Sequence, residues 1–189
     1  MYSPAIERAL RTAVLAHHGQ FRKGDDQCHY AVHPVHVSLM LARLGVEEVV
    51  IQAAILHDVV EDCEDWTIER LEDEFGARVA AIVAELTEDK GRGWEERKRH
   101  AIEHARHIST EAATVKAADQ IHNLESLRAA LEAEDDHDAV WARFRGGRER
   151  SLAVAEELVA ALETRLPDAL RDALRASFEG LRRAAAQRS

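Results

Sequence analysis

The stretch between Val49 and Val60 limits most strongly what this chain can fold into. Apolar side chains follow one another through it, so a helix formed there is apolar on nearly every face. Such a helix is stable only where other elements surround it. We therefore expect a central, buried helix over residues 47–62, around which the rest of the chain packs.

Helical spacing of apolar residues continues through most of the chain. The 189 residues include only three prolines and nine glycines, the residues that most often interrupt helices. The spacing predicts no strand, and residues 20–32 are expected to form a polar loop. The expected fold is all-α, a single domain over 1–189, with helices at 4–18, 34–44, 47–62, 67–71, 77–86, 94–107, 110–131, 138–162 and 167–186.

Charge and composition narrow the class of function. The formal net charge is -10, whereas nucleic-acid binders normally need a basic face. Glu7, Arg8 and Arg11 interrupt the N-terminal apolar pattern, which does not resemble a signal peptide, and no stretch reaches membrane-spanning length. Cys28 and Cys63 have neither zinc-type spacing nor a disulfide framework. We expect a cytoplasmic protein without a nucleic-acid or membrane partner, and the oligomeric state stays open.

The end of the predicted central helix carries four ionisable residues. His57, Asp58, Glu61 and Asp62 fall within two turns of a helix that is otherwise suited to burial. Burying carboxylates costs several kcal/mol each unless a partner compensates their charge. A divalent metal ion is the simplest such partner. A lone His-Asp pair is common on protein surfaces, so further ligands are needed to support this interpretation.

Two residues elsewhere are suited to complete a metal site. His33 lies at a predicted helix entry, and Asp119 lies among apolar neighbours in a predicted helix. Two imidazoles and two carboxylates suit Mn²⁺ or a similar ion. Such an ion activates water and polarises a phosphoryl oxygen. Glu61 and Asp62 could then orient or deprotonate the water, and the predicted reaction is hydrolysis of a phosphoester or phosphoanhydride.

Other histidines offer alternatives. His36 follows His33 by almost one turn and could be taken for the ligand instead. His100, His104 and His107 form a stripe along one predicted helix. This stripe could be a second metal site, but a solvated or interfacial surface is the commoner arrangement.

Four sequence blocks together resemble a known family. They are HHGQFRKGDDQCHYAVHP at 17–34, AAILHDVVED at 53–62, FGARVAAIVAELTEDK at 75–90 and VKAADQIHNLESL at 115–127. Their order and spacing resemble the hydrolase domain of RelA/SpoT-type enzymes, and most of all the stand-alone small alarmone hydrolases. The resemblance covers about 4–162, which leaves a helical extension at about 163–189 and no synthetase module.

The resemblance implies an all-α HD-domain helical bundle that uses Mn²⁺. It implies removal of pyrophosphate from the 3′ position of the nucleotide ppGpp, which leaves GDP. Residues 140–147, VWARFRGG, also resemble a stretch common in bacterial members. The implied metal ligands are His33, His57, Asp58 and Asp119; the implied catalytic pair is Glu61 and Asp62; the implied substrate contacts are Arg22, Lys23, Asn123 and Arg143.

Some positions depart from the family pattern. Cys28 and His29 precede Tyr30 where the family often has Gly or Thr followed by Pro. Gln120 follows the aspartate where a basic residue is usual, and Trp94 falls where the stand-alone hydrolases often have lysine. These departures lie at positions expected to contact the base or the phosphates of the substrate. ppApp and the 2′-phosphate of NADPH therefore stay alternative substrates. A non-catalytic nucleotide sensor is a third, although such a protein has no need of an acidic pair.

Overall fold

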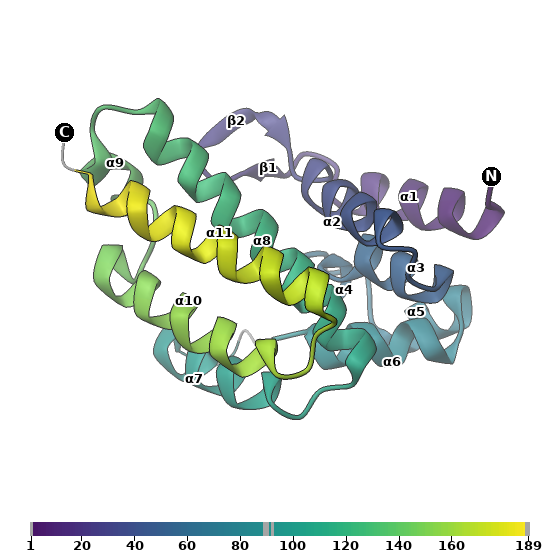
Figure 1. The fold of residues 1–189 in the computed structure, drawn as a ribbon. Coiled ribbons are helices and arrows are strands. Elements are labelled where there is room, and N and C mark those ends of the chain that lie inside the picture. Colours follow the sequence, from purple (N-terminus) through teal and green to yellow (C-terminus); the bar gives the residue numbers. More distant parts are fainter. Residues whose placement is uncertain (1, 89–90, 92, 188–189) are drawn as a thin grey trace. The chain divides into compact units, whose positions relative to one another are not determined.

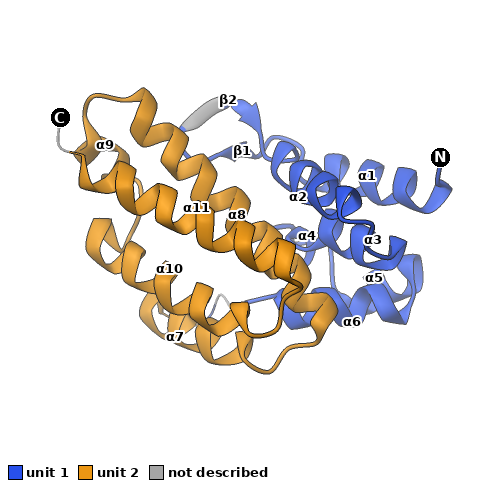
Figure 2. Ribbon diagram, viewed as in Figure 1, with its two compact units in different colours: residues 1–91 blue, residues 92–189 orange. Residues whose placement is uncertain are grey.

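The computed structural model describes residues 2–88, 91 and 93–187. The chain divides into two compact units, residues 1–91 and 92–189 (Figure 2). Helix dominates both units, which confirms the predicted all-α class. That the chain is a single domain stays a prediction. None of the helices within the described ranges combines the length and hydrophobicity that crossing a membrane requires.

The first unit contains six helices and one short hairpin among its described residues (Figure 1). In chain order these elements are α1 (Pro4–Ala16), β1 (Phe21–Arg22), β2 (Asp25–His29), α2 (Val32–Arg43), α3 (Glu48–Leu56), α4 (Val59–Asp62), α5 (Ile68–Phe75) and α6 (Ala77–Leu86).

Helix α3 is the centre of this unit. It packs against α1, α2 and α6, and its side chains from Ala53 to Leu56 are buried. The prediction of a central, buried helix is therefore confirmed. This helix ends at Leu56, however, and the predicted continuous helix over 47–62 is wrong at residues 57 and 58. The His57 ring donates from Nδ1 to the carbonyl oxygen of Ala54 at 2.8 Å. In a regular α-helix this carbonyl oxygen would instead accept from the backbone N–H of Asp58.

The predicted loop at 20–32 contains a two-stranded antiparallel hairpin. Arg22 pairs with Asp25, so Lys23 and Gly24 form the connection. Gly24 has φ +84°, which suits the tight turns of two-residue hairpins. The rings of Phe21 and His29 stack across the strands with centroids 5.0 Å apart. The expectation of no strand is therefore wrong here, because a glycine and one aromatic pair suffice for a short hairpin.

Helix α2 begins two residues earlier than predicted. Pro34 occupies its third position instead of its first. The first backbone N–H groups of a helix have no intrahelical partner, so proline fits anywhere in the first turn. This earlier start places His33 inside the first turn, where its side chain is buried.

The second unit consists of five helices in the part that the structure describes. They are α7 (Trp94–Ala105), α8 (Thr110–Ala133), α9 (His137–Ala142), α10 (Gly147–Glu163) and α11 (Asp168–Ala186). Helix α8 packs along α11, and α10 packs against α7 and α11 (Figure 1). Leu170, Leu174, Phe178 and Leu181 form the buried stripe of α11. The predicted C-terminal extension is therefore an integral part of this unit.

The predicted helix over 138–162 is two helices. The interruption covers residues 143–146 and is followed by Gly147, whose φ of +60° lies outside the helical region. Helix α9 therefore ends at Ala142 and α10 begins at Gly147.

Candidate metal centre and acidic pair

Three side chains of the first unit converge at the end of α3. His33 comes from α2, while His57 and Asp58 occupy the gap between α3 and α4. The Nε2 atoms of the two histidines lie 3.3 Å apart. Oδ2 of Asp58 lies 3.5 Å from Nε2 of His33 and 3.2 Å from Nε2 of His57. Among the described residues, this is the one group of three or more His, Cys, Asp or Glu side chains whose potential ligand atoms all lie within 4.8 Å of one another.

The hydrogen bond made by the His57 ring leaves its other nitrogen available to a cation. The Nδ1 atom of His57 faces a carbonyl oxygen, which only accepts, so Nδ1 carries the proton. In the neutral ring Nε2 then presents a lone pair toward His33 and Asp58. Both imidazoles are almost completely buried, with 1% and 4% of their side chains exposed. Two nitrogen donors and a carboxylate oxygen suit a borderline divalent metal ion.

Glu61 lies one turn beyond the histidine-aspartate pair, on α4. Its Oε2 accepts a hydrogen bond from the backbone N–H of Glu88 at 3.1 Å. Burial raises the pKa of the Glu61 carboxyl above its usual range, and the charges of Glu88, Asp58 and Asp62 raise it further, while the hydrogen bond from Glu88 opposes them. A carboxyl with a raised pKa can accept a proton nearer neutral pH than an ordinary glutamate can.

Asp62 is the last residue of α4, and its main chain is tied to the segment after α1. The side chain of Gln20 donates from Nε2 to the carbonyl oxygen of Asp62 at 3.0 Å, and its Oε1 lies 2.8 Å from Nδ1 of His17. This link fixes the end of α4 to the start of the hairpin. The acidic pair is therefore anchored at both of its residues.

Arg22 and Lys23 lie on the hairpin of the same unit. The guanidinium carbon of Arg22 lies 5.4 Å from the centroid of the Tyr30 ring. The hydroxyl of Tyr30 in turn donates to Oδ2 of Asp58 at 2.6 Å. One tyrosine thus lies between Arg22 of the hairpin and the candidate metal centre.

The other predicted residues belong to the second unit. Asp119, whose sequence neighbours are apolar, is buried on α8, and its Oδ1 accepts from the side chain of Asn123 at 2.6 Å. The two residues therefore share a helix face. Oδ2 of Asp119 lies 3.3 Å from the Lys116 ammonium. Arg143 follows α9 and is paired with Glu134 at 2.7 Å.

The alternative histidines lie in different surroundings. His36 is exposed on α2, whereas His33 is buried. The rings of His100 and His104 stack on the exposed face of α7 with centroids 5.7 Å apart, and Nε2 of His107 lies 3.5 Å from a carboxylate oxygen of Glu103. The stripe is solvated in this structure.

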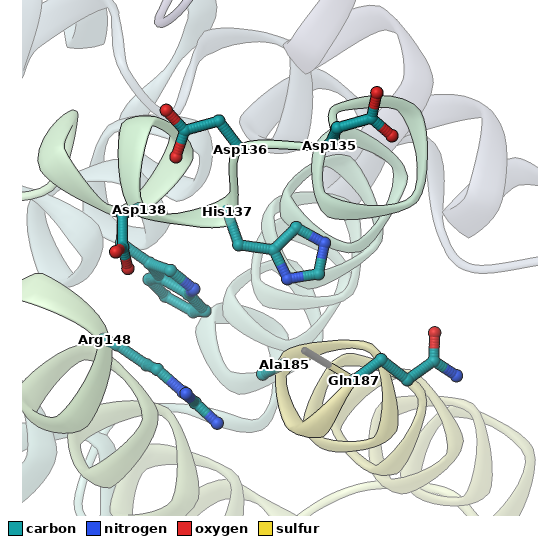
Figure 3. A pocket seen from close by; sticks show the side chains of 8 residues that line it. Asp135, Asp136, His137, Asp138, Arg148, Ala185 and Gln187 are labelled. Carbon is teal, nitrogen blue, oxygen red and sulfur yellow. The ribbon is translucent and has the colours of Figure 1, made fainter. Parts of the chain in front are cut away.

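A pocket of about 640 Å³ opens near the end of α8 in the second unit (Figure 3). None of the predicted site residues lines it. Asp136 uses a carboxylate oxygen to cap α9, and the His137 ring contacts the carbonyl oxygen of Leu131 at 2.8 Å. Asp136 and His137 thus form hydrogen bonds with the ends of α9 and α8. The pocket is lined by Asp135, Asp136, His137, Asp138, Trp141, Arg148, Ala185 and Gln187.

Sequence reasoning missed several residues that support the site. Tyr30, Glu88 and Gln20 each bond a residue of the predicted centre from a distant part of the chain. Periodicity carries no signal for such contacts. The one available hint was a tyrosine three residues before a candidate ligand.

Comparisons with known proteins agree with this architecture. The HD domain family matches residues 9–149, a range that includes parts of both units. The guanosine-3′,5′-bis(diphosphate) 3′-pyrophosphohydrolase MESH1 of Danio rerio is 45% identical over 113 residues, which are 59% of this chain and 62% of that protein. The aligned part of the chain thus spans less than two thirds of that relative.

Two further relatives match over longer ranges. The MESH1 protein of Drosophila melanogaster is 37% identical over 148 residues, which are 75% of this chain and 82% of that protein. The solved structure of a metazoan ortholog of SpoT, described as hydrolysing ppGpp, superposes on this chain with a TM-score of 0.82 at 30% sequence identity. The superposition covers 95% of this chain and 96% of that chain. The chain therefore belongs to the HD domain family, in the RelA/SpoT-type branch that includes the MESH1 proteins.

Proposed function

We propose that this chain is a Mn²⁺-dependent hydrolase that removes pyrophosphate from the 3′ position of ppGpp and releases GDP. The observation that carries the proposal is the group of His33, His57 and Asp58, with the Glu61 carboxyl, whose pKa is raised by burial, one turn away. The names of the MESH1 relatives support the choice of reaction and nucleotide.

The proposed metal site has four protein ligands. His33, His57 and Asp58 supply three donor atoms. We assign the fourth to Asp119, on the strength of the family resemblance and of its burial. When bound, the ion supplies Lewis acidity for the attack of water on phosphorus. The protein has to hold these donors in place, keep the imidazoles buried and leave room for the substrate.

Glu61 is the proposed general base. Burial raises its pKa, which makes its carboxylate a stronger base toward the attacking water than an ordinary glutamate. Asp62 is proposed to orient the water, since it follows Glu61 on α4 and its main chain is fixed by Gln20. Loss of the Glu61 carboxylate should therefore remove turnover without removing the metal.

The proposed substrate contacts supply positive charge on an acidic chain. Arg22 and Lys23 on the hairpin are proposed to hold the base and phosphates, Asn123 the nucleoside and Arg143 a phosphate. The Asn123 amide donates to Asp119. Through this bond, the Asn123 side chain would contact both the proposed metal ligand Asp119 and the nucleoside. Arg143 would have to exchange Glu134 for a phosphate oxygen.

The deciding experiment is an assay of purified protein with Mn²⁺ and ppGpp, in which GDP and pyrophosphate are quantified separately. Equal amounts of the two products support the proposal. ppApp and NADPH are assayed in parallel, because turnover of either in place of ppGpp would keep the chemistry and change the substrate. A folded, Mn²⁺-loaded protein that binds ppGpp without product would identify a sensor and contradict the proposal.

Variants separate the roles of the residues. Asp58→Ala and His33→Ala should lose Mn²⁺ and activity together, while His36→Ala, on the same helix, should keep both. Glu61→Ala should keep Mn²⁺ and lose turnover. Full activity of both Asp58→Ala and Glu61→Ala would contradict the assignment.

A further inference from the structure

Tyr30 is fixed on several sides within the first unit. Its backbone N–H donates to the carbonyl oxygen of Gln20, and its own carbonyl oxygen accepts from the backbone N–H of His33, each at 2.9 Å. Its ring packs on the buried His17 ring at a centroid distance of 4.7 Å and meets the edge of His33 at 5.8 Å. Backbone bonds and two imidazoles therefore determine where the hydroxyl points.

That hydroxyl contacts the oxygen of Asp58 that faces the histidines. It donates to Oδ2 at 2.6 Å, the distance range of a hydrogen bond to a charged carboxylate. The same Oδ2 lies 3.2 Å from Nε2 of His57. A carboxylate oxygen has two lone pairs, so it can accept from Tyr30 and still present a second lone pair on the side of the imidazoles.

We propose that Tyr30 is a positioning residue of the metal centre, which holds the Asp58 carboxylate in its ligating orientation before the ion binds. The identity of the ion rests on the proposed function. Without the hydroxyl, the carboxylate has to be ordered when the ion arrives, and that ordering lowers the affinity. Hydrogen-bond partners of metal ligands commonly contribute about 10- to 100-fold to metal affinity.

The substitution Tyr30→Phe isolates this effect. It keeps the ring that packs on His17 and His33, and it keeps the aromatic face near the Arg22 guanidinium. It removes the hydroxyl that donates to Asp58. The other tyrosine of the chain, Tyr2, is 76% exposed, so Tyr2→Phe is a matched control.

The test is a titration of metal-free protein with Mn²⁺ alone, followed by calorimetry and by the EPR signal of free Mn²⁺. Tyr30→Phe should bind Mn²⁺ about 10- to 100-fold more weakly than the unmodified chain, and Tyr2→Phe should bind equally well. Asp58→Ala gives the baseline without the site. An unchanged Kd in a folded Tyr30→Phe variant overturns the proposal, as does an unmodified chain that binds no Mn²⁺ at this site.

Folding and activity are checked separately. If Tyr30→Phe does not fold, para-amino-phenylalanine at position 30 keeps a weaker donor and should give an intermediate Kd, and an unchanged Kd again overturns the proposal. In the ppGpp assay, excess Mn²⁺ should restore kcat/KM of Tyr30→Phe but not that of Arg22→Ala. Normal Mn²⁺ binding without turnover by the unmodified chain would contradict the proposed function and leave the titration as a valid test of Tyr30.

Discussion

Glu88 acts on Glu61 in two opposite ways. Its backbone N–H donates to Oε2 of Glu61 at 3.1 Å, which stabilises the ionised carboxylate. Its own negative charge disfavours that ionised form, as burial does more strongly. The pKa of Glu61 is raised on balance, because desolvation outweighs one hydrogen bond. The backbone contact and the side-chain charge can be separated by mutation.

Glu88→Gln should therefore change the pH dependence of the reaction. A general base works only when ionised, so activity should fall as the pH drops through the pKa of Glu61, and this acid limb should lie above the usual glutamate range. Removing the Glu88 charge lowers the pKa of Glu61 and should move the limb to lower pH. A profile of kcat/KM against pH measures the shift. Glu72→Gln, at an exposed position of α5, should leave the profile unchanged, and a limb that moves to higher pH would contradict the role of Glu61.

Mn²⁺ should stabilise the folded chain. A ligand that binds only the native state at 100 times its Kd adds about 2.7 kcal/mol to the free energy of unfolding. The thermal midpoint should therefore rise with Mn²⁺ and fall again with a chelator. The rise should be absent in Asp58→Ala and retained in His36→Ala. An equal rise in all three proteins would place the ion elsewhere.

Two glycines in the second unit should respond to alanine with opposite signs. A Cβ on Gly146 would lie 2.7 Å from an atom of the Trp94 ring, so Gly146→Ala should destabilise the fold by about 1–3 kcal/mol. A Cβ on Gly180 would lie 3.2 Å from the flexible Arg128 side chain, in the interior of α11. Gly180→Ala should stabilise by up to about 1 kcal/mol through helix propensity. Denaturant unfolding of both variants measures the difference, and a stabilised Gly146→Ala would show that the indole moves freely.

The two cysteines should differ in reactivity. Cys63 is buried and its thiol donates to the carbonyl oxygen of Ala16 at 3.3 Å, while Cys28 is partly exposed on β2. A thiol reagent should modify Cys28 quickly in the native protein and Cys63 only on unfolding. Cys28→Ser should remove the fast phase. A fast phase that survives this substitution would mean that Cys63 is accessible.

Sequence and structure agree where one local pattern decides the outcome. The apolar run through α3 predicts burial on its own, and Asp119 and Asn123 meet because four residues separate them on a helix. The break at His57 was missed, since it involves a side chain that bonds the backbone, which periodicity does not register. The hairpin was missed because two short strands are too brief for an alternating pattern.

The supporting contacts of the site could not be predicted for a related reason. Tyr30 reaches Asp58 across 28 positions and Glu88 reaches Glu61 across 27. Only packing of the helices brings these segments together. The candidate ligands were predictable from their residue types, whereas the groups that orient them depend on tertiary structure.

The interruption of the helix after Leu56 changes how the side chains of two consecutive residues, His57 and Asp58, are oriented. Consecutive side chains on a regular helix point about 100° apart around its axis. In the gap between α3 and α4, His57 and Asp58 instead bring Nε2 and Oδ2 to 3.2 Å. Two candidate ligand atoms from consecutive residues thus lie side by side. Engineering that extends α3 smoothly into α4 should therefore gain helix and move these two atoms apart.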